Sequence, residues 1–241
     1  MSPSAQETSS ANADFFVGIG ASAGGFEALR PLIERLRPTG RVAYIVVQHV
    51  PADHPSSLAE LLARNARLAV RVAIDGEPVI PDQVLVAPPG WNIAVRDDRV
   101  QLIAPLADAR VAPSIDRLLV SLAESRGDRA VGVLLSGTGR DGVAGGRAIR
   151  EAGGRVIVQR PANARYADLP EAAIQAGVAN RQMDVEDIAD SLKALADPPP
   201  VPADPPPGAT DADAAAFQEL LQLVLAATQM DATHYKRLVH K

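Results

Sequence analysis

Short apolar runs alternate with longer amphipathic stretches from residue 14 to about residue 196. The apolar runs are rich in Val and Ile and contain few polar residues, as expected of strands that are covered on both faces. The amphipathic stretches repeat their apolar residues at helical spacing. Repeated strand–helix units of this kind predict an α/β fold with a doubly wound, largely parallel sheet and helices on both faces.

The expected elements follow one another in a simple order, with one interruption. We expect strands at 15–20, 42–47, 130–136 and 155–159, and helices at 26–36, 56–66, 113–126, 142–153, 169–177 and 184–196. Residues from about 70 to 105 differ, because four short β-like runs are separated there by Asp-Gly, Pro-Asp, Pro-Pro-Gly and Asp-Asp turns. This region predicts a small antiparallel hairpin region.

The remaining segments differ from this body in composition. Residues 1–13 are rich in Ser and Ala and predict a disordered N-terminus. Residues 14–196 predict one domain, and the proline-rich stretch 197–214 predicts a stiff linker. The tail, 215–241, begins with an amphipathic helix that is too short to form a domain by itself.

Composition and charge exclude several classes of protein. The 241 residues include no cysteine, which excludes disulfides, thiolate metal sites and a cysteine nucleophile. No apolar run approaches the roughly 18 residues of a membrane span, and the polar N-terminus does not resemble a secretory signal. The net charge is −5 and no basic stripe is visible, which argues against a nucleic-acid partner. We therefore expect a cytoplasmic protein that does not insert into a membrane.

Three loops at the expected carboxyl ends of strands carry chemically unusual residues, and ligands of open parallel sheets bind at these ends. Gly20-Ala21-Ser22-Ala23-Gly24 fits the G-x-S-x-G pattern, in which a sharp turn exposes a serine hydroxyl. Gln48-His49 follows the second strand, and the glycine-rich segment 136–142 places Asp141 after another. A serine nucleophile needs a base that is held by a third group. The three loops predict a serine esterase with Ser22 as nucleophile, His49 as base and Asp141 as orienting acid.

The histidines are few enough to support this choice by elimination. His234 and His240 lie beyond the proline-rich linker, and His54 lies in a polar loop. His49 is left as the base, because successive strands of such sheets are often neighbours. We expect His54 and the neighbouring Asp53 to be loop residues or caps, and Pro113-Ser114 to start a helix rather than to supply a second nucleophile.

Two other interpretations stay open from these residues alone. Gly18, Gly20 and Ala23 also satisfy the relaxed dinucleotide-binding pattern G-x-G-x-x-G/A. That interpretation requires an acidic residue at the end of the second strand, where Gln48-His49 stands. The glycine-rich loop could also be a purely structural turn, with His49 satisfied in a loop and Asp141-Gly142 forming a common turn dipeptide.

Taken together, five segments resemble the catalytic domain of the chemotaxis protein-glutamate methylesterases (CheB-type). They are IGASAGGFEAL (19–29), VVQHVP (46–51), DGEPVIPDQVLVAPPG (75–90), PSIDRLL (113–119) and GVLLSGTGRDGVAGGRAI (132–149). They occur in the family's order and span nearly all of residues 15–195. The resemblance assigns residues 14–196 to a methylesterase catalytic domain and maps the family's serine, histidine and aspartate onto Ser22, His49 and Asp141.

The resemblance implies hydrolysis of glutamate methyl esters on the cytoplasmic helices of chemoreceptors, with release of methanol and without a metal or organic cofactor. Glutamine deamidation at the same sites is a further activity of some members. The backbone amide of Ala23 is the expected oxyanion donor, with the Thr138 region as a second candidate. Implied partners are methyl-accepting chemoreceptors and, as open cases, a separate response regulator or receptor methyltransferase. The alternative is a non-catalytic, methylesterase-like binding or regulatory module.

The sequence departs from the family's pattern at several places. No receiver domain precedes the matched segments, so we expect regulation from outside this chain. Alanine stands at 23 where many members have threonine, threonine at 138 where many have methionine, and Asn92 where many have histidine, with no assignable role. Residues 217–237 resemble the opening of the receptor methyltransferases' helical N-terminal domain, which suggests the front of a methylesterase–methyltransferase hybrid. An ordinary partner-binding or disordered helix is the equal alternative, and methyltransferase activity is not expected.

Overall fold

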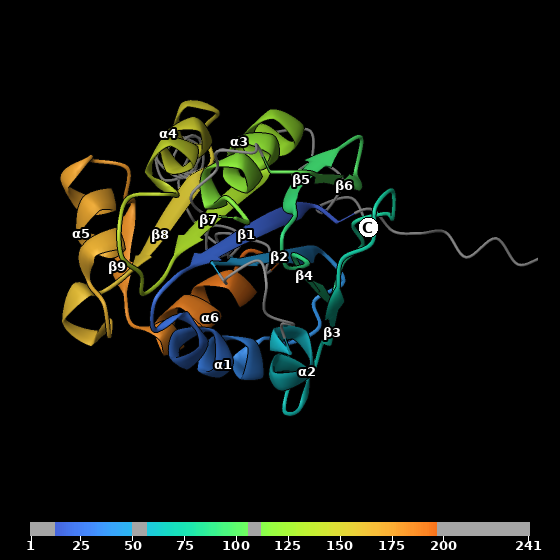
Figure 1. The fold of residues 1–241 in the computed structure, drawn as a ribbon, viewed down its shortest axis with the longest axis horizontal. Helices are drawn as coiled ribbons and strands as arrows, with labels where there is room; N and C mark the ends of the chain where they lie inside the picture. Colours follow the sequence, from blue (N-terminus) through green and yellow to red (C-terminus); the bar gives the residue numbers. More distant parts are fainter. Residues whose placement is uncertain (1–12, 50–56, 106–111, 197–241) are drawn as a thin grey trace, which may run out of the picture. The chain divides into compact units, whose positions relative to one another are not determined.

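The computed structural model describes residues 13–49, 57–105 and 112–196. The expected linker at 197–214 and tail at 215–241 lie outside these ranges, as do residues 1–12 of the expected N-terminal segment and Asp53, His54, His234 and His240. The described residues form an α/β fold with a seven-stranded sheet and a separate two-stranded hairpin (Figure 1). The predicted fold class is confirmed.

The seven strands all run parallel, in the order β3-β4-β2-β1-β7-β8-β9. Their bounds are β1 (Phe15–Ala21), β2 (Val42–Gln48), β3 (Ala69–Val72), β4 (Gln83–Val86), β7 (Ala130–Leu134), β8 (Arg155–Gln159) and β9 (Arg181–Met183). Strands β1, β2 and β7 are almost wholly buried, because helices cover both faces of the sheet.

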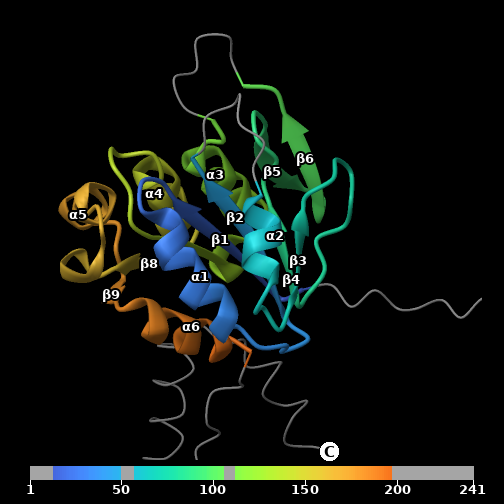
Figure 2. The ribbon, with the colours of Figure 1, turned by 60° about the horizontal axis from the view of Figure 1, so that its bottom comes forward.

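Helices form a layer on each face of the sheet (Figure 2). One layer contains α1 (Gly25–Arg35), α2 (Leu58–Ala63) and α6 (Val185–Lys193), and the other contains α3 (Ile115–Arg126), α4 (Val143–Glu151) and α5 (Asp168–Gln175). Two single-turn 3₁₀ helices, Gly127–Arg129 and Pro161–Asn163, link elements on the second side. Alternate residues of the strands contribute to two separate cores, so that Phe16 packs in one and Val17 in the other.

The region from 70 to 105 divides into two parts. Strands β5 (Asn92–Arg96) and β6 (Arg99–Ile103) form the expected antiparallel hairpin, which lies beside α3 (Figure 1). Strands β3 and β4 instead join the main sheet as a parallel pair. Their turn-rich connection resembles a hairpin locally, but β4 pairs with β2, and pairing with a strand distant in sequence is not visible in local patterns. Strand β9 was not expected, since its three residues are too few and too polar to show a period.

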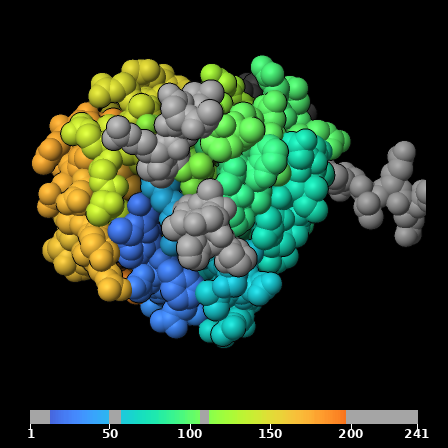
Figure 3. Space-filling model, in the orientation of Figure 1, coloured from blue at the N-terminus to red at the C-terminus, as the bar shows by residue number. Residues whose placement is uncertain are grey.

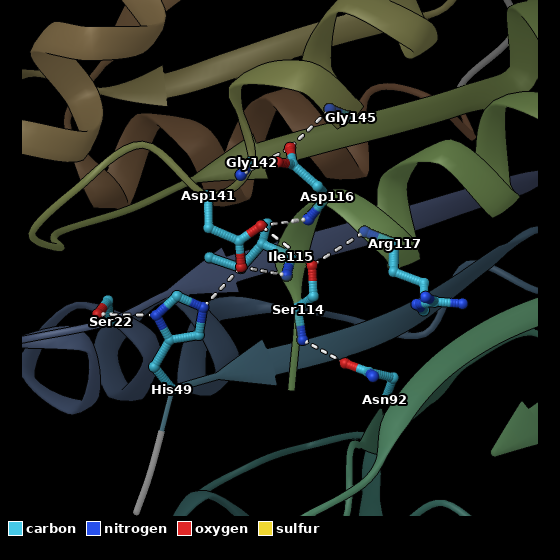
Figure 4. A network of polar contacts seen from close by, with 10 residues as sticks. All are labelled: Ser22, His49, Asn92, Ser114, Ile115, Asp116, Arg117, Asp141, Gly142 and Gly145. Carbon is cyan, nitrogen blue, oxygen red and sulfur yellow. Dashed lines mark hydrogen bonds and ion pairs between the residues drawn. The ribbon is translucent and has the colours of Figure 1, made fainter. Parts of the chain in front are cut away.

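The order of the strands reverses beside β1, and this reversal positions the candidate site. The chain leaves β1 through α1 to reach β2 on one side, and leaves β7 through α4 to reach β8 on the other. Ligands of open α/β sheets bind in the crevice outside the carboxyl ends of such strands. The loops that carry Ser22, His49 and Asp141 all emerge at this edge (Figure 4).

Helix α3 crosses β1 at close range because β1 carries glycines where the two meet. A Cβ atom on Gly20 would lie 2.3 Å from Ile115 Cγ2, and one on Gly18 would lie 2.7 Å from Leu119 Cδ2. Both distances are too short for packed carbon atoms. Gly18 and Gly20 are therefore strand residues that allow α3 to pack closely against β1, and they form no phosphate-binding loop in this structure.

Candidate active site

The register of β1 against β2 places Ser22 beside His49. Ala21 pairs with Gln48 at the end of the two strands, so the next residue of each chain stands at the same level. The His49 amide donates to the Ala21 carbonyl at 3.1 Å, which extends the pairing by one step. The His49 side chain then reaches Ser22, with 3.1 Å between Nδ1 and the serine Oγ (Figure 4).

Asp141 lies on the far side of the histidine ring, 2.8 Å from its Nε2 (Figure 4). The Asp141 carboxylate also lies at the start of α3. Its Oδ2 accepts from the Ile115 amide at 2.7 Å, and its Oδ1 accepts from the Asp116 amide at 2.9 Å. The Ser114 hydroxyl also donates to Oδ1, at 3.1 Å. The first amides of a helix have no partner within the helix and favour an anion, so α3 holds Asp141 in place.

These contacts determine which nitrogen of His49 carries the proton. An ionised carboxylate only accepts hydrogen bonds, so Nε2 must donate to Asp141. Nδ1 of the neutral ring is then an acceptor, and it faces the Ser22 hydroxyl. The arrangement can therefore draw the serine proton onto Nδ1 while Asp141 stabilises the resulting positive charge.

The environment of Asp141 favours its charged form. Burial acts to raise the pKa of this carboxyl, but the hydrogen bonds from His49 and from the Asp116 and Ile115 amides outweigh it. The net result is a pKa below the ordinary value of 3.8. Asp141 is thus ionised at neutral pH, as an orienting acid must be.

Asp116 has the opposite shift. Its carboxylate accepts from the Gly142 amide at 2.8 Å and from the Gly145 amide at 2.7 Å, both at the start of α4 (Figure 4). Burial raises the pKa of Asp116 above 3.8, and the nearby Asp141 charge adds to this, against the lowering effect of the two amides. Asp116 therefore holds the backbone that directly follows Asp141.

Ser136 and Gly137, which follow β7, contact Ser22 and Ala23 and hold their backbone in place. The Ser22 amide donates to the Ser136 carbonyl at 3.0 Å, and the Ser136 hydroxyl donates to the Ala23 carbonyl at 2.9 Å. A Cβ atom on Gly137 would lie 2.9 Å from Ser22 Cβ, so only glycine permits this approach. The Thr138 amide follows directly, and neither it nor the Ala23 amide donates to any residue within the described ranges.

A hollow of about 280 Å³ opens beside the site, next to Gly24 and Ser136. Its lining includes Glu27 and Arg165, which form an ion pair with each other, and the acidic Glu186. On the face drawn in Figure 3, the blue surface of the β1–α1 segment is bordered by yellow-green and orange surface on one side and by teal and green on the other.

The structure brings Ser22, His49 and Asp141 together. Ala23 follows the serine directly, and Thr138 follows Gly137, which packs against the serine. Sequence reasoning missed Asn92, Ser114 and Asp116. Asn92 is 6% exposed, and its Oδ1 accepts from the Ser114 amide at 2.8 Å. Ser114 is the N-cap of α3, as the expected helix start at Pro113-Ser114 required. The Ser-x-Asp spacing at 114–116 was the available signal, but its meaning depends on Asp141, which lies 25 residues beyond Asp116.

Two further observations concern the described ranges. No group of three or more His, Asp and Glu side chains is placed there to hold a metal ion. Within the same ranges, none of the helices has both the length and the apolar character needed to cross a membrane.

The fold and the site define an α/β protein with a hydrogen-bonded serine, histidine and aspartate at the carboxyl edge of a parallel sheet. Residues 17–192 match the family model described as CheB methylesterase. The chain belongs to the CheB methylesterase family.

Individual relatives agree with this assignment. The chain is 36% identical over 184 residues to a "protein-glutamate methylesterase/protein-glutamine glutaminase 1" of Carboxydothermus hydrogenoformans, covering 74% of this chain and 54% of that protein. It is 37% identical over 183 residues to a similarly named protein of Chromohalobacter salexigens, covering 74% and 51%. The chain thus spans about half the length of these curated relatives. The crystal structure of the Thermotoga maritima CheB methylesterase catalytic domain superposes with a TM-score of 0.71 at 30% identity, covering 75% of this chain and 98% of that one.

Proposed function

We propose that this chain hydrolyses glutamate methyl esters on proteins, with Ser22 as nucleophile, His49 as base and Asp141 as orienting acid. The observation that carries the proposal is the continuous hydrogen-bonded chain from Ser22 Oγ through His49 to Asp141, in a domain of the CheB methylesterase family. The names of the curated relatives support the same activity.

In the first half of the reaction, Ser22 Oγ attacks the ester carbonyl carbon while Nδ1 of His49 takes the serine proton. The carbonyl oxygen becomes an oxyanion. We assign its stabilisation to the Ala23 amide, which lies just before the N-cap of α1, with the Thr138 amide as the second donor. Donors of this kind contribute about 3 kcal/mol each in comparable hydrolases. The intermediate collapses as His49 returns the proton to the methoxy oxygen, and methanol leaves.

The second half of the reaction releases the product. Water attacks the glutamyl-serine ester while Nδ1 of His49 takes a proton from it, and the second tetrahedral intermediate forms at the same place. Its collapse returns that proton to Ser22 Oγ and releases a glutamic acid side chain, which ionises to the carboxylate as its remaining proton passes to solvent. A glutamine side chain could follow the same route with ammonia as the leaving group, in line with the glutaminase part of the relatives' names.

The family and the surroundings of the site support a proposal for the substrate class. We assign the substrate to methylated helices of chemoreceptor cytoplasmic regions, and the protein to the cytoplasm. The open hollow beside Gly24 and Ser136 would receive side chains that flank the ester. A separate response regulator and a receptor methyltransferase remain the proposed partners beyond the receptor.

The direct test is methanol release from methylated receptor fragments, comparing the wild type with Ser22→Ala and with Ser125→Ala. Ser125 lies on α3, where its hydroxyl donates to the Val95 carbonyl, far along the helix from Asp141. The proposal predicts full release by the wild type and by Ser125→Ala, and from Ser22→Ala only the small residual rate that the oxyanion donors and substrate binding support. Absence of release from the wild type on several receptors would favour a non-catalytic binding module instead.

A further inference from the structure

The β5–β6 hairpin is hydrogen-bonded to α3 at several points along the helix. The Val95 amide donates to Ser121 Oγ at 3.0 Å, and Ser125 Oγ donates to the Val95 carbonyl at 2.9 Å. Nearer the start of the helix, Asn92 Oδ1 accepts from the Ser114 amide. Only this last contact reaches the end of α3 that holds Asp141.

The Ser114 hydroxyl is fixed in direction by its two neighbours. The Arg117 amide lies 3.3 Å away and, as an N–H group, can only donate to Ser114 Oγ. Asp141 Oδ1 lies 3.1 Å away and, as a carboxylate oxygen, can only accept. The Ser114 hydrogen therefore points to Asp141. It supplies one of the four donors around a carboxylate that has about four acceptor positions.

Asn92 fixes the backbone of Ser114. Ser114 is the N-cap residue of α3, so its amide has no partner within the helix. This amide lies beside the side chain of Asn92, which is buried. The Asn92 oxygen meets that amide at 2.8 Å. Loss of this contact would free the N-cap residue to rotate and would turn the hydroxyl away from Asp141.

We infer that Asn92 and Ser114 are positioning residues for Asp141, which they hold against His49 through a relay from the hairpin. The inference rests on the proposed function, because it gives Asp141 a catalytic task. It also assigns a role to Asn92, for which the sequence suggested none. The relay runs from Asn92 to the Ser114 amide, from the Ser114 hydroxyl to Asp141, and from Asp141 to Nε2 of His49 (Figure 4).

The test compares Ser114→Ala, Ser114→Thr and Asn92→Leu with Ser125→Ala. Ser114→Ala removes the hydroxyl, and Ser114→Thr retains it together with good N-cap character. Asn92→Leu removes the acceptor at similar volume. Ser125→Ala is the matched control, because it removes a hairpin–α3 hydrogen bond of the same kind away from Asp141. Urea unfolding of all four variants identifies any that fail to fold.

Three measurements separate positioning from a structural role. Steady-state kinetics of methanol release give kcat and KM. Labelling by a fluorophosphonate reports the reactivity of Ser22 without a receptor substrate. Nitrogen-15 NMR of the histidine rings at neutral pH reports which ring nitrogen of His49 carries the proton, with the His49 signals assigned from His49→Gln.

We expect Ser114→Ala and Asn92→Leu to lower kcat and the labelling rate about 10-fold, as for the loss of one hydrogen bond to a charged group. KM should stay within about twofold, and part of the His49 population should move from the Nε2–H to the Nδ1–H tautomer. Ser114→Thr should recover both rate and tautomer, and Ser125→Ala should match the wild type throughout.

Equal losses in Ser114→Ala and Ser125→Ala, or an unchanged His49 tautomer in Ser114→Ala, would overturn the inference. Failure of the proposed function has a different signature. In that case the wild type releases no methanol, while the labelling rates and histidine spectra still separate Ser114→Ala from Ser125→Ala.

Discussion

Asp116 and Asp141 form reciprocal hydrogen bonds with the starts of two helices, α4 and α3. Asp141 stands just before α4 and accepts from the first amides of α3, whereas Asp116 stands in the first turn of α3 and accepts from Gly142 and Gly145 at the start of α4. Two helix ends thus fix two carboxylates in one reciprocal arrangement. Only Asp141 also reaches His49.

Because Asp116 contributes through acceptor oxygens, asparagine should replace it better than alanine. Asp116→Asn keeps an oxygen that can accept from the two amides. It also removes a carboxylate that burial disfavours, as the raised pKa of Asp116 indicates. We expect its free energy of unfolding at pH 7 to equal or exceed that of the wild type. The difference should shrink as the pH falls through the raised pKa of Asp116, where the wild type also becomes neutral.

Asp116→Ala is the variant to compare with Asp116→Asn, because it removes the acceptor oxygens as well as the charge. It leaves two helix amides unpaired and should cost about 1–2 kcal/mol of stability, with a fall in kcat because the backbone beside Asp141 loosens. Urea unfolding at pH 7 and pH 4 measures both variants. If alanine and asparagine behave alike, the acceptor role assigned to Asp116 is wrong.

The lowered pKa of Asp141 predicts a specific pH dependence of stability. A carboxyl with a pKa below 3.8 in the folded state stabilises the fold fully above the unfolded value, and this contribution is lost as the pH falls through the folded pKa. The free energies of unfolding of the wild type and Asp141→Asn should therefore differ by a constant amount above about pH 5, by the two-state titration of one group.

Below that range the two curves should converge toward acid pH. Chemical denaturation at pH steps between 7 and 3 gives the comparison. A difference that grows toward acid pH would mean that burial, rather than the amides of α3, dominates at Asp141.

The close crossing of β1 and α3 predicts different effects for two glycine substitutions. Gly20→Ala would place a methyl group 2.3 Å from Ile115 Cγ2, at the turn of α3 that holds Asp141. We expect a loss of about 1–3 kcal/mol in stability, as for other overpacked cores, together with reduced activity. Gly132→Ala on the neighbouring β7 is the control, because its methyl group would meet the nearest atoms of Leu119 at an ordinary 3.5 Å.

Thermal unfolding and methanol release of these two variants test whether Gly20→Ala is more damaging than Gly132→Ala. Equal tolerance of both alanines would show that α3 shifts freely, and the account of Asp141 as rigidly held would fail.

The sequence was sufficient to predict the parallel sheet, because long apolar runs such as residues 42–47 are typical of strands covered on both faces. It also placed Ser22 and His49 at the ends of neighbouring strands. Their contact depends on the register that pairs Ala21 with Gln48, and no local pattern specifies that register.

Other features depend on contacts between distant segments. Asn92 and Ser114 come from a hairpin and a helix cap, and neither stands out in its own segment; their connection to Asp141 appears only in the folded structure. The Gly18–Gly20 pattern left the dinucleotide-binding interpretation open for a related reason. Close approach of a helix to a strand and close approach of a phosphate to a loop both require residues without side chains, so the pattern alone does not distinguish them.

The central claim is that Ser22, His49 and Asp141 act as one unit, and a double-mutant comparison tests it most directly. The measurement is kcat for methanol release by Ser22→Ala, Asp141→Asn and the variant with both substitutions. Asp141→Asn alone should lower kcat about 10⁴-fold, as in a serine protease with the equivalent change. If the residues form a unit, the double variant loses no more than Ser22→Ala alone. Losses that multiply in the double variant would contradict the account.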